Sequence, residues 1–422
     1  RKESSAASDV YKRQSLLIIA LLAFSMGVSA QSKTKVAYHG RGLTIKGTKG
    51  FKLKVSNTYT LDGVAFAPTF DASQATLDNQ PFEIKPNIAF TNLQTNLSGD
   101  FSKRWGFEFH INYAQNKINL LNMLLDYRFN DNLKLRMGQM KVPGPMSQNY
   151  GTGTAMNVAT PMGLSMASAR RLGLGLFYNT GRLYSAIGAY SINLNEYAGS
   201  SLPKRPEVGV AGRFTYNVLN NRHQKLLLGT NIYWMRMLNG EFNQSGAIGI
   251  ETLASTARFI RYYHSNATSQ LNYGLELAYQ NRNFLLTAEG LGTNFFRSSD
   301  LSTPQYAGWN VRASYTVLGN PRRYNASMAD FSGSPYNGKQ ALEIGLRSSG
   351  IYYNDHEGIE ALAGYSVGAF ANYWTTSHLC FSLLANYIDH HKDFKSNYTI
   401  SDPNSFKGLD FMVFQGRVTI LF

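Results

Sequence analysis

"LNYGLELAYQ", residues 271–280, decides the fold of this chain, because apolar and polar side chains alternate along it without a break. Leucine or tyrosine fills every odd-numbered position, whereas Asn, Gly, Glu, Ala and Gln fill the even-numbered ones. Successive side chains of a β-strand point to opposite faces of the sheet. The stretch therefore predicts a strand with one apolar face and one polar face.

The same alternation recurs along most of the chain, for example over residues 105–113, 309–317 and 412–422. The segments run to about ten residues, which is the length of a tilted strand that crosses a bilayer. Their number predicts an all-β fold, a transmembrane antiparallel β-barrel of about 16 strands. One of the expected starts belongs to a loop strand or is spurious, and Ala257 is the weakest. The starts lie near Phe51, Asn87, Trp105, Asn119, Leu133, Arg171, Leu183, Glu207, Gln224, Ala257, Leu271, Asn283, Tyr306, Gln340, Leu362, Leu379 and Leu409.

The connections between these segments alternate between tight turns and long loops. Residues 129–132, 180–182 and 280–283 are short and polar. The longer connections cover residues 62–85, 142–170, 238–270, 318–339 and 390–407. Short turns at one rim and long loops at the other are typical of membrane barrels. A soluble β-sandwich would also alternate, but usually with shorter strands and more polar outward faces.

The N-terminal region predicts export. Residues 15–24 form an apolar run behind Lys12 and Arg13, and Val28-Ser29-Ala30 has the small residues of a cleavage site. This order is that of a signal peptide over residues 15–30, and the run is too short for a membrane-spanning anchor. Residues 1–14 lack an initiator Met and are expected to be an extraneous extension. Residues 31–422 are expected to form the barrel, in the outer membrane of a Gram-negative cell.

The chain is strongly basic, with a formal net charge of +15. Such a balance suits nucleic acid, anionic lipid or anionic solutes. Nucleic-acid binding is not expected, because the chain is predicted to be exported and has neither a compact Lys/Arg cluster nor a nucleic-acid-binding motif. The single cysteine, Cys380, excludes a disulfide within the chain and is expected to be an inert wall residue.

Strand parity predicts which charged side chains face the lumen. Charges avoid the lipid face, so inward parity is required in any barrel and does not by itself indicate transport. Inward basic residues nevertheless outnumber inward acids such as Asp126, Glu276 and Glu343, and walls rich in Arg and Lys favour the passage of anions. Some of these cations will pair with wall carboxylates. The candidate pore-lining and anion-binding residues are Arg128, Lys134, Arg136, Lys141, Arg170, Arg171, Arg213, Arg312, Arg347 and Arg417.

Four stretches give the chain a more specific likeness: "GLTIKGTKGFKLKVSNTYTLDG", "TNLSGDFSKRWGFEFHINYA", "LLDYRFNDNLKLRMGQMKVP" and "ARRLGLGLFYNTGRLYSAIGAY". These stretches keep their order and spacing, and the barrel pattern continues to "GRVTILF". On these residues the chain resembles the phosphate-selective porin O/P family of Gram-negative bacteria, and within it the members of Bacteroidetes type. The resemblance implies a 16-stranded barrel, a homotrimer in outer-membrane lipid, and an inward-folded constriction loop after "GQMKVP". It also implies passive diffusion of phosphate, polyphosphate or other small anions.

The expected constriction loop departs from the family pattern. Residues 142–169 contain no Lys, Arg, Asp, Glu or His, and are rich in Met, Ser, Thr and Gly. Any basic ladder must therefore come from the walls, through residues such as Lys134, Arg136, Arg171 and Arg213. We expect a porin with an anion preference.

Other functions find little support in the sequence. Gly173 and Gly175 give only a bare GxG within a strand, not a dinucleotide loop. His390 and His391 are adjacent, so on a strand they would point to opposite faces, and no third ligand is near. No nucleophile-elbow context is present. We expect no catalytic residues, no metal and no cofactor; the alternatives are a barrel enzyme, such as an outer-membrane lipase or protease, and a non-conducting structural barrel.

Overall fold

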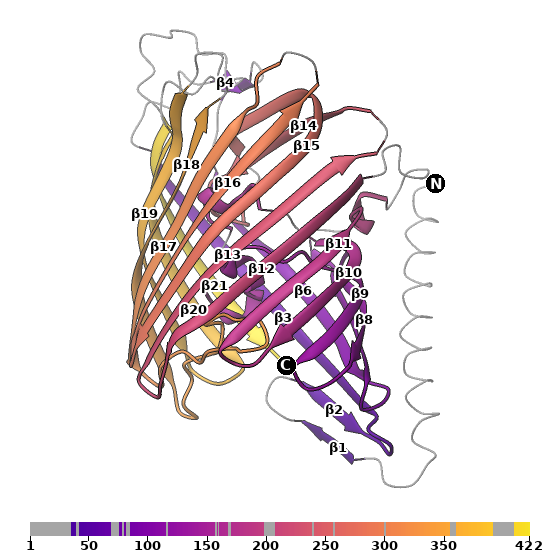
Figure 1. The fold of residues 1–422 in the computed structure, drawn as a ribbon. Helices are drawn as coiled ribbons and strands as arrows, with labels where there is room; N and C mark the ends of the chain where they lie inside the picture. The colour runs from indigo at the N-terminus through magenta and orange to yellow at the C-terminus, as the bar shows by residue number, and fades with distance from the viewer. Residues whose placement is uncertain are drawn as a thin grey trace, which may run out of the picture.

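Sixteen antiparallel strands form a closed barrel in the computed structural model, which confirms the predicted fold class (Figure 1). The structure describes residues 35–38, 42–68, 76–77, 80–81, 85–114, 117–156, 158, 160–167, 170–197, 207–238, 240–255, 258–298, 301–354, 360–390 and 409–422. The proposed extension over residues 1–14 and the signal peptide over residues 15–30 lie outside this part of the chain. No helix in the described part is long and apolar enough to cross a membrane.

Each wall strand pairs with its neighbours around the ring. In order, the strands are β3 (Lys52–Pro68), β6 (Asn87–Asp100), β7 (Trp105–Asn112), β8 (Asn119–Arg128), β9 (Leu133–Lys141), β10 (Arg170–Asn179), β11 (Leu183–Tyr190), β12 (Glu207–Asn220), β13 (Gln224–Met237), β15 (Arg258–Asn281), β16 (Phe284–Arg297), β17 (Gln305–Leu318), β18 (Ala341–Asn354), β19 (Glu360–Trp374), β20 (Leu379–His390) and β21 (Leu409–Leu421).

The ring closes between the first and last wall strands. β21 pairs with β3 from Phe411 opposite Pro68 to Leu421 opposite Thr58. Across this junction the buried Arg417 guanidinium binds the Asp62 carboxylate with both contacts at 2.6 Å. Closure leaves no free sheet edge in the wall, which a membrane barrel requires.

Smaller elements lie outside the ring or in the connections. β1 (Lys35–Tyr38) and β2 (Leu43–Lys46) form a hairpin that pairs with the start of β3, and β14 (Phe242–Gly249) pairs with the upper part of β15. β4 (Thr76–Leu77) and β5 (Gln80–Pro81) pair with each other. The short helices are α2 (Met146–Asn149), η3 (Thr152–Thr154), η4 (Met162–Leu164) and η5 (Leu194–Tyr197).

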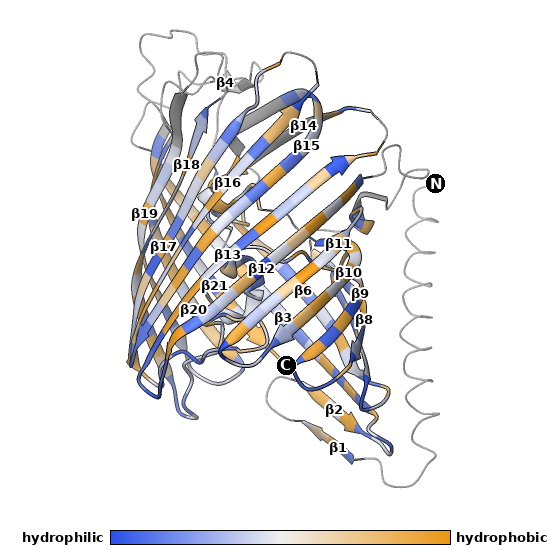
Figure 2. Cartoon of the chain, in the orientation of Figure 1, coloured by the Kyte–Doolittle hydropathy of each residue, from blue (hydrophilic) through white to orange (hydrophobic). Residues whose placement is uncertain are grey.

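The outward face is apolar, as the alternation predicted. Leu275, Leu346 and Leu383 are 72%, 65% and 65% exposed. Glu276, which follows Leu275 on the same strand and has the opposite parity, is buried. Figure 2 shows this alternation as orange and blue along the strands. Because a hydrocarbon solvent accepts such apolar side chains, this face suits a bilayer.

The structure also shows which of the expected strand starts does not begin a separate wall strand. Ala257 and Leu271 do not begin two strands, because β15 runs continuously over 24 residues from Arg258 to Asn281. Its first part extends beyond the wall and pairs with β14. The other starts lie within two residues of those expected from the sequence.

One connection departs from the predicted rim asymmetry. Tight turns join β6 to β7, β8 to β9, β10 to β11, β12 to β13, β15 to β16 and β19 to β20 at one end of the barrel, here called the short-turn rim. Residues 319–340 join β17 to β18 at this same rim, although the sequence grouped them with the long loops of the other rim.

Candidate pore constriction

The described residues of the segment 142–169, here called the lumenal loop, fold into the barrel after β9, as the family resemblance implied. Three wall side chains from distant strands hold its backbone. Glu289 on β16 accepts the Ser147 N–H at 2.8 Å, Asn272 on β15 donates to the Met166 carbonyl at 2.6 Å, and Asn372 on β19 donates to the Ala155 carbonyl at 3.0 Å. The loop therefore crosses the lumen and lies against the opposite wall.

The methionines of the lumenal loop are packed rather than presented to the channel. Met146, Met156, Met162 and Met166 are all buried, and they pack with apolar side chains from inward-facing wall positions. Gly163 fits tightly against β17, since a Cβ there would lie 2.1 Å from the Trp309 carbonyl oxygen. Flexible apolar side chains fill irregular gaps well, so the loop acts as a core inside the barrel.

A second segment braces the lumenal loop from the β14–β15 connection. The Glu251 carboxylate, which is buried, accepts the Met162 N–H at 2.6 Å and the Asn386 amide at 2.7 Å, and faces the Arg347 guanidinium at 3.1 Å. Burial raises the pKa of Glu251, but the charge of Arg347 and the hydrogen bonds that the carboxylate accepts outweigh it, so the pKa lies below its usual value. Glu251 is therefore an ionised anchor for the tip of the loop.

The third inward segment is residues 319–340, which enter from the short-turn rim. Arg213 on β12 donates to the Met328 and Ala329 carbonyls at 2.6 and 2.9 Å, and Gln280 on β15 donates to the Arg322 carbonyl at 2.6 Å. Because these are inward side chains of the wall, the segment lies within the lumen.

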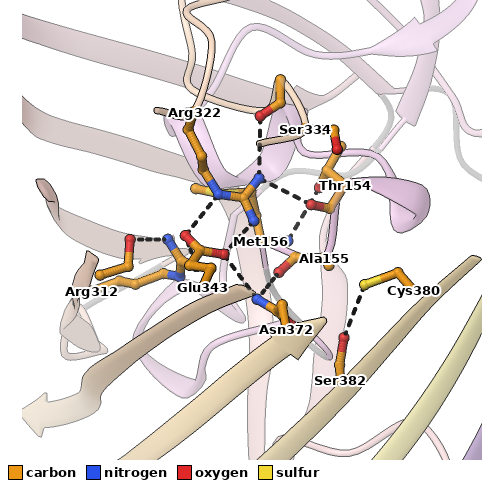
Figure 3. Close-up of polar contacts among 12 residues, drawn as sticks. Thr154, Ala155, Met156, Arg312, Arg322, Ser334, Glu343, Asn372, Cys380 and Ser382 are labelled. Atoms are coloured by element: carbon orange, nitrogen blue, oxygen red, sulfur yellow. Dashed lines mark hydrogen bonds and ion pairs between the residues drawn. The ribbon is translucent and has the colours of Figure 1, made fainter. Parts of the chain in front are cut away.

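Arg322 joins this segment to both the wall and the lumenal loop (Figure 3). Its guanidinium makes two contacts with Glu343 on β18, at 2.8 and 2.6 Å, and donates to the Thr154 carbonyl at 3.1 Å. Glu343 also pairs with Arg312 on β17 at 2.9 Å. Segments that enter from opposite rims are thus tied at one buried cluster.

These three segments fill much of the lumen beside β12 to β20, and an open cavity of about 670 Å³ lies on the other side. It runs between the lumenal loop and the wall of β6 to β10. Of the ten candidate residues, Arg136, Lys141, Arg170 and Arg417 line it. A smaller cavity of about 240 Å³ continues toward the short-turn rim, shares Glu108 with the first, and includes Arg128.

Eight of the ten candidate residues are paired with carboxylates. The pairs are Arg128–Asp100, Lys134–Asp126, Arg136–Asp126, Arg171–Glu207, Arg213–Glu276, Arg312–Glu343, Arg347–Glu251 and Arg417–Asp62. Arg213, Arg312, Arg347 and Arg417 are also almost wholly buried. Much of the inward positive charge is therefore compensated within the wall.

Lys141 and Arg170 differ from the other eight. Lys141 Nζ donates to the Gln148 carbonyl at 2.7 Å, and Arg170 Nε donates to the Asn122 side chain at 3.1 Å. Neither lies within ion-pair distance of a carboxylate in the described part of the chain. They bring to the wall of the open cavity two cationic side chains without a direct ion-pair partner among the described residues.

The structure adds two titratable residues to this cavity that were not among the candidates. Glu108 accepts the Asn122 amide at 2.8 Å, and His110 Nδ1 lies 3.8 Å from the same carboxylate. Both lie on the polar face of the alternating segment 105–113, so parity could have found them. Among the described residues, no group of three or more His, Cys, Asp or Glu side chains could hold a metal ion.

The comparisons with known proteins agree with this geometry. A model of the family described as phosphate-selective porin O and P matches residues 87–412. The chain belongs to this family. It forms an outer-membrane porin channel.

Solved structures show the same fold at low sequence identity. Outer-membrane OmpT of Vibrio cholerae is 10% identical in sequence, with a TM-score of 0.54. The superposition covers 89% of this chain and 99% of the OmpT chain. An anion-selective porin from Comamonas acidovorans is 10% identical with a TM-score of 0.51, covering 88% of this porin and all of the other chain. A search of curated proteins found no match.

Proposed function

We propose that this porin passes small solutes by diffusion along the wall of β6 to β10 and prefers anions, including oxyanions such as phosphate. The observation that carries the proposal is the pair of cations, Lys141 and Arg170, which make no direct ion pair among the described residues and lie beside an uncharged loop. Charges that line a narrow path with low-dielectric walls act strongly on a passing ion. A guanidinium and an ammonium together suit a small anion.

Selectivity in a planar bilayer tests this function. The full-length chain, purified and inserted into the bilayer, is measured in a KCl gradient, and the reversal potential is expected to show chloride preference. A reversal potential of the opposite sign contradicts the anion preference. No measurable conductance would instead support a non-conducting structural barrel. Added phosphate is expected to reduce the chloride current, and an unchanged current removes phosphate as a competing solute.

The proposed transport needs no covalent chemistry, and we assign no catalytic residue, cofactor or metal to it. A barrel enzyme would require a nucleophile beside a general base at one rim. Release of fatty acid from vesicles that contain the purified porin would contradict this part of the proposal.

A homotrimer is part of the proposal, because one side of the barrel is short. β7 and β11 each have 8 residues, fewer than the roughly 9–11 that a tilted strand needs to span the bilayer. Contact with another copy would cover this side. Spin labels on Ile187→Cys, on the outward face of β11, are expected to lie close together between copies, and labels on Leu383→Cys of β20 to lie far apart. Equal distances in the two variants would contradict this arrangement.

Export by a cleaved signal is likewise proposed from residues 15–30. The mature chain, taken from outer membranes, is expected to begin near Gln31. N-terminal sequencing that reads into residues 15–30 would contradict cleavage there.

A further inference from the structure

Two neighbouring hairpin tips at the short-turn rim enclose a cleft that the transport path does not use. The β12–β13 and β15–β16 turns lie side by side because β13 pairs with β15, and the Arg282 N–H donates to the His223 carbonyl at 2.7 Å. The cleft measures about 600 Å³ and is lined by Asn221, Arg222, His223, Gln224, Asn281 and Arg282. It is open to the outside of the barrel end rather than to the lumenal cavities.

The cleft carries positive charge that nothing in the described part of the protein compensates. Arg222, His223 and Arg282 are all exposed. None of them lies within ion-pair distance of a described carboxylate. Two guanidinium groups beside an imidazole match the geometry and charge of a phosphate group.

An apolar, lipid-facing surface begins next to the cleft. Val218, Leu219 and Phe284 lie at the adjoining ends of β12 and β16 and are 46%, 39% and 37% exposed. A ligand bound in the cleft would therefore have its anionic group among the arginines and apolar surface beside it. This is the arrangement of a phospholipid at a membrane interface.

The rest of this rim has the same sign of charge. Exposed cations in its described turns and in residues 319–340 are Lys103, Arg104, Arg182, Arg323 and Lys339. The described acids of these segments are Asp131, which is exposed, and Asp330, which is buried. A rim of one sign attracts an anionic lipid surface within a Debye length.

We propose that the cleft formed by Arg222, His223 and Arg282 binds the phosphate headgroup of an anionic phospholipid in the leaflet at the short-turn rim. Free phosphate shares the headgroup chemistry, but it would leave the adjoining apolar surface without a partner. The site lies outside the conducting path, so it is independent of the anion preference proposed for Lys141 and Arg170.

Native mass spectrometry of the full-length porin tests this site. The protein is exchanged into detergent with equal amounts of phosphatidylglycerol and phosphatidylcholine, and retained lipid is counted on the wild type and on Arg222→Gln/Arg282→Gln. The matched control is Lys103→Gln/Arg104→Gln, which removes the same charge from another turn of the rim. Wild type and control are expected to retain phosphatidylglycerol preferentially, and the cleft variant to retain about 10- to 30-fold less.

Three outcomes would overturn the proposal. Equal retention of the two lipids by the wild type removes the headgroup preference, and this measurement needs no variant to fold. An equal loss in the cleft variant and the control assigns the effect to rim charge in general. Displacement of phosphatidylglycerol by millimolar inorganic phosphate assigns the cleft to free phosphate. Bilayer selectivity of the cleft variant is expected to match the wild type, so failure here is separable from failure of the proposed transport.

Discussion

Lys141 and Arg170 are cross-strand partners on β9 and β10, and they stand at the two ends of the lumenal loop that separates them in sequence. The loop itself has no charged residue from 142 to 169. The charge nearest to the loop in sequence therefore comes from the two strand ends that flank it.

Neutralising this pair is expected to remove most of the anion preference. In Lys141→Gln/Arg170→Gln the chloride-to-potassium permeability ratio should fall to near one, because the two cations of the cavity wall that make no direct ion pair are gone. Reversal potentials in a KCl gradient measure the change. Arg236→Gln, an exposed cation on the outward face of β13, is the control and should retain the wild-type ratio. A double variant that keeps the full preference would show that other residues set it.

Removing Arg322 is expected to loosen both inward segments. Arg322→Met leaves the buried Glu343 with only the Arg312 and Asn372 contacts and frees the Thr154 carbonyl, so the free energy of unfolding should fall by about 3 kcal/mol. Urea unfolding measures the stability, and single-channel records should show larger current fluctuations. The neighbouring Arg323 is exposed, so Arg323→Met should change neither. Current fluctuations in Arg322→Met no larger than those of the wild type would show that the Arg322 contacts do not hold the two segments in place.

A side chain at position 163 is expected to push the lumenal loop off the wall. In Gly163→Ala the new Cβ would meet the Trp309 carbonyl oxygen at 2.1 Å, so either the loop or β17 must move. We expect a loss of about 1–3 kcal/mol in stability and an altered single-channel conductance. Gly151→Ala, whose Cβ would meet only Thr154 Cγ2 at 3.8 Å, is the control. Unchanged conductance in Gly163→Ala would mean that the path does not depend on the position of the loop.

Acid is expected to release the tip of the loop through Glu251. The pKa of Glu251 is lowered in the folded protein, so its stabilising effect is present above its unfolded value, which is about 4.3. The effect is lost as the pH falls through the lower, folded value. Single-channel current should therefore stay steady from neutral pH to about pH 4 and become noisy below it. Glu251→Gln should be noisy already at neutral pH; a quiet Glu251→Gln channel would contradict the role of the charge.

Much of the fold could be predicted from the sequence, because a barrel wall repeats one simple constraint. Alternation placed the strand starts within about two residues, and it put Arg213 and Arg312 on the inward face. It could not identify their partners. Glu276, which pairs with Arg213, lies on β15 with β13 in between, and such a contact depends on tilt and register rather than on local pattern.

The two features that the sequence placed less well both involve chain inside the lumen. Residues 319–340 have the length of an outer loop, and it is their contacts with inward side chains such as Arg213 and Gln280 that show that they turn inward. Lys141 and Arg170 lie at strand ends, where strict parity no longer determines direction. Hydrophobic patterning reports the contrast between lipid and lumen, and it carries no information on which segments fill the lumen.

The absence of charge in the lumenal loop separates two properties of the channel. In the transport that we propose, the packed loop limits how large a molecule can pass, while the strand residues beside it decide which sign of charge passes. Substitutions within residues 142–169 could change the size limit and leave the ionic preference alone, and changes at Lys141 or Arg170 could do the reverse. Sieving and discrimination by charge can thus diverge independently in this porin.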